Sequence, residues 1–195
     1  MRVLAHLVLW HLGLAQAETQ TTAAERECLA RYASGKRRLV EIGVWHGVTT
    51  RLLRSAMASD GILFAVDPYR LGRLGFSAHR YIARREVERV RNGTVEWVQL
   101  TGPEAGRAHR AAGREPVEFI FIDGDHTYEA VRADWEAWSS LVAPRGIVAV
   151  HDSRSTSDRN IDSAGSVIFT ASVVLRDQRF AQVDVVDSLT VLRRV

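Results

Sequence analysis

The most informative part of this 195-residue chain is the run Phe119-Ile120-Phe121-Ile122-Asp123-Gly124-Asp125-His126-Thr127-Tyr128-Glu129. Four β-branched or aromatic residues lead directly into a group of carboxylates and an imidazole. A short, continuous apolar run indicates a strand that is buried on both faces of a parallel sheet. In open α/β sheets, ligands bind beyond the carboxyl ends of the strands. The sequence therefore predicts a functional site at Asp123, Asp125 and His126.

Strand and helix patterns alternate around this run. The expected strands before the C-terminal region are 39–42, 62–66, 95–100, 117–122 and 147–150, and the helices expected between them are 47–57, 78–91, 103–112 and 127–142. Such alternation predicts an α/β fold with a doubly wound, mostly parallel sheet and helices on both faces. A helix is expected at 164–176. The last two strands, 180–186 and 189–192, are separated by two residues, which permits only an antiparallel hairpin. The expected sheet therefore has seven strands.

Composition indicates an ordinary globular domain, with 46% hydrophobic and 25% charged residues. The net charge is +3, and the arginines are scattered among acidic residues, which argues against a nucleic-acid-binding face. No stretch reaches the ~18 apolar residues that a membrane span requires. Cys28 is the single cysteine, which excludes an intramolecular disulfide and a cysteine metal cluster. We expect one domain over residues 1–195, with residues 1–35 as an N-terminal helical extension.

The hydrophobic N-terminus permits two interpretations. Its Ala15-Gln16-Ala17 ending resembles the cleavage site of a secretory signal. His6 and His11, however, interrupt the apolar run, and its apolar residues fall on one helical face. This pattern favours an amphipathic helix of a mature, cytoplasmic protein. Thr22 with Glu25 then fits the capping box that starts a second helix.

A second group of residues indicates a nucleotide-like cofactor. The motif Glu41-x-Gly43-x-x-x-Gly47 lies where the first expected strand turns into its helix, and Asp67 ends the second strand. Glycines allow the backbone to approach a ligand, and a helix start offers free N–H groups. An acidic residue at the place of Asp67 is suited to ribose hydroxyls. Trp45 occupies the middle glycine position of a dinucleotide fingerprint, so a cofactor without a pyrophosphate fits better.

These motifs resemble those of class I S-adenosylmethionine-dependent methyltransferases, in particular the small bacterial methyltransferase-24 type. The blocks that carry the resemblance are Leu39-Val40-Glu41-Ile42-Gly43-Val44-Trp45-His46-Gly47, Asp67-Pro68 and Phe121-Ile122-Asp123-Gly124-Asp125-His126-Thr127-Tyr128. The resemblance extends over residues 20–195, and Trp45 departs from its glycine pattern. It implies a Rossmann-like methyltransferase fold and S-adenosylmethionine as the cofactor. The cofactor-binding residues that it implies are Thr21, Thr22, Glu41, Gly43, Trp45, Gly47, Asp67, Pro68 and Asp123.

Acidic and histidine side chains at two strand ends predict activation of an acceptor. Asp123 ends one strand, and His151-Asp152 ends the next, so these side chains are expected to converge on Mg²⁺ or another divalent metal. The more distant metal-dependent O-methyltransferases place ligands at corresponding strand ends. The alternative is that the carboxylates cap helices and that His151 is a buried structural histidine. The candidate catalytic residues are His126, as general base, and Asp123. Asp125 would orient the His126 ring or add to the metal site, and the alternative for His126 is that it caps the following helix.

The leading hypothesis is O-methylation of a small-molecule hydroxyl. The main alternative is a cofactor-binding partner of a biosynthetic complex without catalysis of its own. An NAD-dependent dehydrogenase and an RNA methyltransferase are disfavoured by the missing glycine and by the missing basic face. Segments 70–77 and 153–163 are expected to shape the acceptor site. Contacts between two copies are expected through the N-terminal helices.

Overall fold

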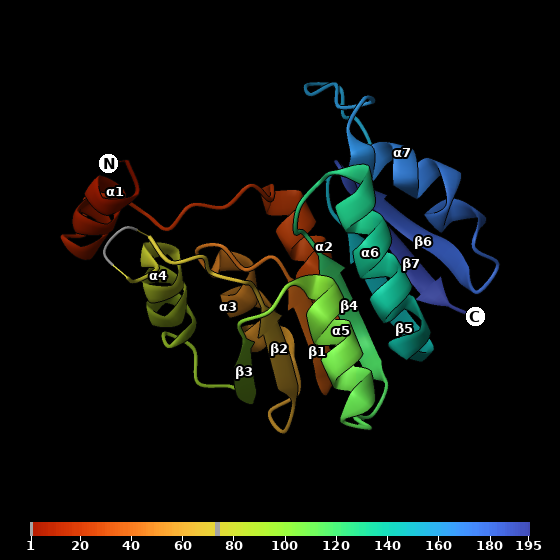
Figure 1. Ribbon diagram of the computed structural model, residues 1–195, viewed down its shortest axis with the longest axis horizontal. Helices are drawn as coiled ribbons and strands as arrows, with labels where there is room; N and C mark the ends of the chain where they lie inside the picture. The colour runs from red at the N-terminus through yellow and green to blue at the C-terminus, as the bar shows by residue number, and fades with distance from the viewer. Residues whose placement is uncertain (1, 73–74) are drawn as a thin grey trace.

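The computed structural model describes the chain except for residues 1 and 73–74, the latter within the predicted acceptor segment 70–77. Its centre is a seven-stranded sheet with the order β3-β2-β1-β4-β5-β7-β6 (Figure 1). The strands are β1 (Arg38–Ile42), β2 (Ile62–Val66), β3 (Thr94–Val98), β4 (Val117–Ile122), β5 (Val142–Val150), β6 (Phe180–Val186) and β7 (Leu189–Arg194). Neighbouring strands from β3 to β5 are parallel, and β7 is antiparallel to both β5 and β6. The predicted fold class is confirmed.

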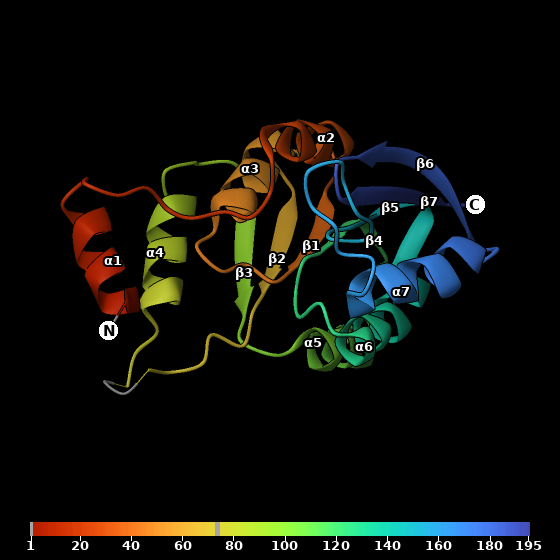
Figure 2. The ribbon, with the colours of Figure 1, turned by 90° about the horizontal axis from the view of Figure 1, so that it is seen from above.

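Helices cover both faces of the sheet (Figure 2). The helices are α1 (Arg2–His11), α2 (Ala23–Ala33), α3 (Val48–Ala56), α4 (Ala78–Val87), α5 (Gly102–Ala111), α6 (Tyr128–Trp138) and α7 (Gly165–Ser172), with 3₁₀ turns at Ser139–Leu141 and Val174–Arg176. Successive residues of β4 alternate between the two cores. Phe119 and Phe121 pack with α2 and α3, whereas Ile120 and Ile122 pack with α5, α6 and α7. Because both faces are covered, β4 is apolar at every position from Phe119 to Ile122.

The register of the sheet sets which residues meet at its carboxyl edge. Ile122 pairs with Ile42 of β1 on one side and with Val150 of β5 on the other. The residues that follow these partners therefore leave the sheet side by side. Gly43, Asp123 and His151 are those residues, and this places the predicted cofactor turn next to the predicted metal ligands.

Strand β5 begins earlier than the sequence predicts. It starts at Val142, which pairs with Val117, and pairing resumes only at Ile147 opposite Phe119. The residues between form an irregularity in the strand, with Arg145 at a φ of +62°. Pro and Gly in this segment therefore mark a bulge within the strand rather than a turn before it.

The N-terminal helix α1 lies beside α4, away from the sheet (Figure 1). Its Trp10 is buried and donates a hydrogen bond from Nε1 to Oε1 of Glu86, at 3.0 Å. Leu4, Val8 and Leu12, which belong to the predicted apolar face, are exposed. The predicted helix is thus present, but this part of its apolar face is not covered by the described chain. None of the described helices combines the length and apolar character needed to cross a membrane.

We predict that Ile120→Ala lowers the free energy of unfolding by about 2–5 kcal/mol, because Ile120 is fully buried in the central strand and its truncation leaves a cavity. Ile168→Ala is the matched control, since Ile168 is 47% exposed on α7 and should change stability by less than about 0.5 kcal/mol. Urea denaturation followed by circular dichroism measures both. Equal effects of the two substitutions would contradict this assignment of the core.

Candidate functional site

A cavity of about 390 Å³ opens at the carboxyl edge of the sheet. It is bounded by the ends of β1, β2 and β4 and by Glu18, Thr19 and Gln20. These three residues belong to the segment 12–22 that joins α1 to α2, which we call the N-terminal strap (Figure 2). A volume of this size lies within the range of small-molecule and cofactor sites. The strap therefore closes one side of a pocket whose floor is made by the strand ends.

Gly43 is required by the close approach of the ends of β1 and β4. Its φ is +89°, and a Cβ atom on it would lie 2.0 Å from the carbonyl oxygen of Asp123. The turn continues through Trp45, which also has a positive φ of +48°. Oδ2 of Asp67 accepts hydrogen bonds from the backbone N–H groups of Val44, at 3.0 Å, and Trp45, at 3.1 Å. Glycine and this carboxylate together keep the turn's backbone open to the cavity.

Some of the predicted cofactor residues line this cavity, namely Gly43, Trp45, Asp67, Pro68 and Asp123. Asp67 also stabilises the backbone on its other side, because its Oδ1 accepts a hydrogen bond from the backbone N–H of Tyr69 at 2.8 Å. A carboxylate has about four acceptor positions, so Asp67 retains capacity for a ligand hydroxyl.

Thr21, Thr22, Glu41 and Gly47 do not line the cavity. Thr22 caps α2 and donates its hydroxyl to Oδ2 of Asp187, at 2.6 Å. Gly47 begins α3, and a Cβ atom there would lie 2.9 Å from Cα of Ala83. Its glycine is thus explained by packing against α4. The strap residues that face the cavity are 18–20, just before the threonines that the sequence points to.

Glu41 is buried in β1, close to the floor of the cavity. It is 1% exposed, and its Oε2 has no hydrogen-bond partner among the described residues. Burial raises the pKa of this carboxyl well above its ordinary value, and the charge of Asp123 adds to the effect, although Thr50 opposes it. Burial thus favours the protonated, neutral form of Glu41 over the carboxylate.

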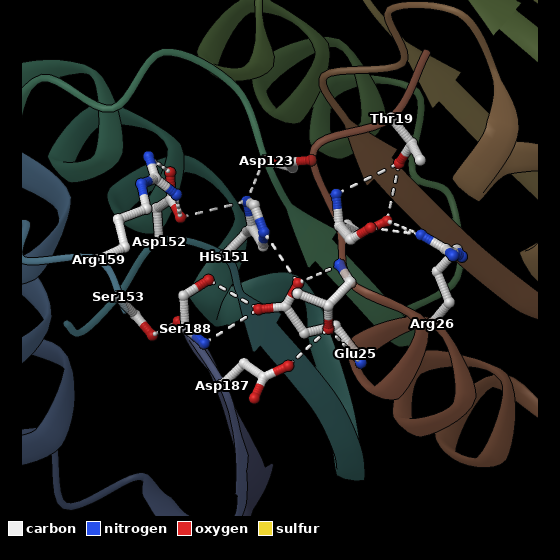
Figure 3. Close-up of polar contacts among 12 residues, drawn as sticks. Thr19, Glu25, Arg26, Asp123, His151, Asp152, Ser153, Arg159, Asp187 and Ser188 are labelled. Carbon is white, nitrogen blue, oxygen red and sulfur yellow. Dashed lines mark hydrogen bonds and ion pairs between the residues drawn. The ribbon is translucent and has the colours of Figure 1, made fainter. Parts of the chain in front are cut away.

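Carboxylates and imidazoles from distant parts of the chain meet beside the cavity, and Figure 3 shows the carboxylates around His151. Oδ1 of Asp123 lies 2.7 Å from Nδ1 of His151 and 3.3 Å from Nε2 of His126. The other nitrogen of each ring also contacts a carboxylate: His126 Nδ1 lies 2.9 Å from Oδ2 of Asp152, and His151 Nε2 lies 3.3 Å from Oε2 of Glu25. Glu25 has no place among the predicted site residues, since its capping-box signal indicates only a helix start.

Asp152 is held by an arginine of the predicted acceptor loop. It is 1% exposed at a φ of +46°, and Arg159 donates to both of its carboxylate oxygens, at 2.7 and 2.9 Å. The nearest distance from Asp152 to Nδ1 of His151 is 3.9 Å. The sequence predicts Asp152 as a metal ligand, whereas the structure places it behind His126 and beneath Arg159.

The contacts of this cluster change the charge states of its members. The pKa of His126 is raised to about 9, first by Asp123 and then by Asp152. Burial disfavours the charged form of His151, but Asp123 and Glu25 outweigh it and raise its pKa to about 10. Burial likewise opposes ionisation of Glu25, and contacts with His151, Thr22 and Ser188 nevertheless lower its pKa to about 2. Both imidazoles are therefore protonated near pH 7 in the metal-free protein.

Asp123, His126 and His151 fit a divalent transition metal. Each offers a donor atom, and these atoms lie within 4.8 Å of one another. Nδ1 of His151 is buried and lacks an aligned hydrogen bond, even though a carboxylate oxygen of Asp123 is close to it. Two imidazole nitrogens and one carboxylate suit zinc, iron or nickel better than Mg²⁺. The carboxylates behind the two rings, Asp152 and Glu25, match the outer partners that orient metal-bound histidines.

Comparison with known proteins agrees with this geometry. A family model described as "Methyltransferase domain", of the methyltransferase-24 type, matches residues 40–153, which is more than half of the chain. The uncharacterized protein y4gI of Sinorhizobium fredii is 28% identical over 129 residues, which cover 62% of this chain and 14% of that protein. The chain thus spans a small part of this curated relative.

Solved structures share the fold at low sequence identity. An O-methyltransferase from Bacillus cereus in complex with SAH has 19% identity and a TM-score of 0.67, covering 100% of this chain and 91% of that one. The O-methyltransferase TomG from Streptomyces achromogenes, involved in tomaymycin synthesis and in complex with SAM, has 16% identity and a TM-score of 0.69, covering 100% and 90%. The chain therefore belongs to the methyltransferase-24 type of class I S-adenosylmethionine-dependent methyltransferases.

Proposed function

We propose that this methyltransferase transfers a methyl group to a hydroxyl oxygen of a small molecule, assisted by a divalent transition metal at Asp123, His126 and His151. The observation that carries the proposal is that Asp123 belongs to both sites. It lines the cavity, and it contacts both imidazoles. An acceptor held at the imidazoles would therefore lie next to a cofactor held in the cavity. Close and oriented placement of two reactants is a large source of acceleration.

The cavity fits S-adenosylmethionine, which supplies an electrophilic methyl group on a sulfonium sulfur. The turn at Gly43 has no room for a side chain, because a Cβ atom at this position would collide with the backbone carbonyl of Asp123. Asp67 would accept ribose hydroxyls, and Glu18 of the strap adds a carboxylate to the cavity wall. Trp45 lies in the wall as well. These residues bind and orient the cofactor and limit its access to water.

A divalent cation at the cluster would act as a Lewis acid that lowers the pKa of an acceptor hydroxyl. Asp123, His126 and His151 would hold it, with Asp152 and Glu25 fixing the two rings. His126 is protonated near pH 7 in the metal-free protein, so its predicted role as general base applies there only near or above its pKa of about 9. We therefore assign His126 to the ligand set.

The acceptor is proposed to be a small molecule. Segment 153–163, which projects beyond α7 in Figure 1, is tied to the cluster through Arg159 and would lie beside such an acceptor. The exposed Leu4 and Val8 of α1, with Leu12 directly after it, would contact a second copy of the chain. The cytoplasmic location expected from the sequence stays a prediction.

A second candidate is a cofactor-binding partner without catalysis of its own. One observation favours it: in the metal-free protein every ring nitrogen of His126 and His151 already faces a carboxylate. Wild-type protein that binds S-adenosylhomocysteine, yet is as inactive as Asp123→Asn toward hydroxylated small molecules, would support this candidate.

We predict that the wild-type protein binds S-adenosylhomocysteine and that Gly43→Ala abolishes binding, because the added methyl group collides with the β4 end. Gly113→Ala is the control: Gly113 also has a positive φ, +61°, but a Cβ atom there would meet nothing within 4 Å. Isothermal titration calorimetry measures all three proteins. Absence of binding by the folded wild type would contradict the cofactor assignment.

We predict that the wild-type protein binds Zn²⁺ at the cluster and that Asp123→Asn weakens this binding at least about tenfold, because a charged ligand is lost. Asp125→Asn should have little effect, since Asp125 is exposed and accepts only the backbone N–H of Thr127. Affinity should also rise with pH toward the His126 pKa of about 9, because the bound rings must lose protons.

Calorimetry at several pH values and methyl transfer before and after chelation measure these effects. Equal metal affinity in Asp123→Asn and wild type would remove the cation from the proposal.

A further inference from the structure

Glu25 lies outside the part of the chain that defines the family, yet it reaches the functional site. It belongs to α2, and the family match begins at residue 40. Its carboxylate is 1% exposed and meets His151, which is also buried, across the end of the sheet (Figure 3). Oε2 of Glu25 lies 3.3 Å from Nε2 of His151.

Every acceptor direction of this carboxylate is used by a defined partner. Oε1 accepts hydrogen bonds from the backbone N–H and the hydroxyl of Ser188, at 3.0 and 2.7 Å. Oε2 accepts the backbone N–H of Thr22, at 2.8 Å, in addition to its contact with His151. The β6–β7 hairpin and the start of α2 therefore fix both oxygens, and Glu25 presents a charged acceptor at one place on the histidine ring.

The orientation of His151 follows from this contact. An imidazole that donates Nε2–H to a carboxylate turns Nδ1 to the opposite side, and Nδ1 of His151 is the nitrogen that lies beside Asp123. His126 is backed in the same way by Asp152. Both rings of the cluster thus have a carboxylate behind them, which is the arrangement that fixes the tautomer of metal-binding histidines.

We propose that Glu25 is a positioning residue: it holds His151 so that Nδ1 is the nitrogen offered to a cation or acceptor beside Asp123. The part of this proposal that concerns a cation rests on the proposed function. The orientation of the His151 ring by Glu25 does not depend on a cation and can be measured in the metal-free protein. Thr22 and Glu25 share a capping box where the N-terminal strap meets α2. The contact between Glu25 and His151 therefore also links the strap to the carboxyl edge of the sheet.

The test compares Glu25→Gln with two control variants. Glu27→Gln removes a charge from the exposed side of the same helix. Ser188→Ala removes a hydroxyl partner of Glu25 without touching His151. Circular dichroism and thermal unfolding establish that each variant is folded. Two-dimensional ¹H–¹⁵N spectra of the histidine rings then report the protonation state of His151 and the hydrogen bonding of each of its ring nitrogens in the metal-free protein.

Glu25→Gln is expected to shift the Nε2 resonance of His151 and speed exchange of its proton, whereas Glu27→Gln leaves the resonance near its wild-type position. Ser188→Ala should shift it less than Glu25→Gln does, because the backbone N–H of Ser188 still donates to Oε1 of Glu25. Zn²⁺ affinity of Glu25→Gln is expected to fall about 10–100-fold. Zn²⁺ binding at the cluster is measured by subtracting the binding that remains in Asp123→Asn. The subtraction is needed because His6, Glu18 and His46 form a second group that could bind the ion.

Unchanged His151 resonances in folded Glu25→Gln would overturn the proposal, as would an equal shift in Ser188→Ala, which indicates a purely structural role. If the wild type binds no Zn²⁺ at Asp123 but Glu25→Gln alone shifts His151, the positioning role is supported and only the metal of the proposed function fails.

Discussion

The carboxylate and carbonyl groups of Asp123 are the constraint on which the rest of the site depends. Oδ1 contacts His126 at 3.3 Å and His151 at 2.7 Å, while the carbonyl oxygen occupies the space that a side chain at position 43 would need. One residue therefore shapes the cofactor turn and holds the acceptor cluster. Any displacement of the β4 end would move both the turn at Gly43 and the two imidazoles, because Asp123 contacts each of them.

Charge balance explains how such a crowded cluster is stable. Three basic side chains, His126, His151 and Arg159, face three carboxylates, Asp123, Asp152 and Glu25, so the charges of the cluster are close to balanced. Replacement of the protons on the two rings by one divalent cation leaves this balance unchanged. Loss of a single carboxylate would leave one charge without a partner, and an uncompensated buried charge strongly destabilises a protein. Exchange of the two ring protons for the proposed cation would therefore need no change in the net charge of the surrounding residues.

Much of this architecture could be predicted from local sequence. Apolar runs that end in polar residues fixed the strands, and the two residues between the last strands required a hairpin. The glycine at position 43 and the acid at position 67 indicated this turn because each stands at the carboxyl end of an expected strand, where ligands bind in α/β sheets. Asp123 and His151 could be paired because parallel strands connected by one helix end at the same edge.

The remainder depends on contacts that no local pattern encodes. Glu25 has the sequence signal of a helix cap, and its second role exists only because the β6–β7 hairpin and His151 are brought to it by tertiary packing. Arg159 forms an ion pair with Asp152, but it belongs to a polar loop in which no sequence periodicity indicates such a contact. Pro144 and Gly146 resemble a turn, yet the pairing of Val142 with Val117 makes them a bulge. In each case long-range geometry decides between roles that the residue type allows equally.

The most direct measurement is a crystal structure of the protein with S-adenosylhomocysteine and Mn²⁺, with anomalous diffraction locating the metal. The account predicts the ligand in the cavity under the N-terminal strap, its sulfur toward Asp123, and one anomalous peak bounded by Asp123, His126 and His151. A ligand bound elsewhere, or a metal held only by His6, Glu18 and His46, would contradict it.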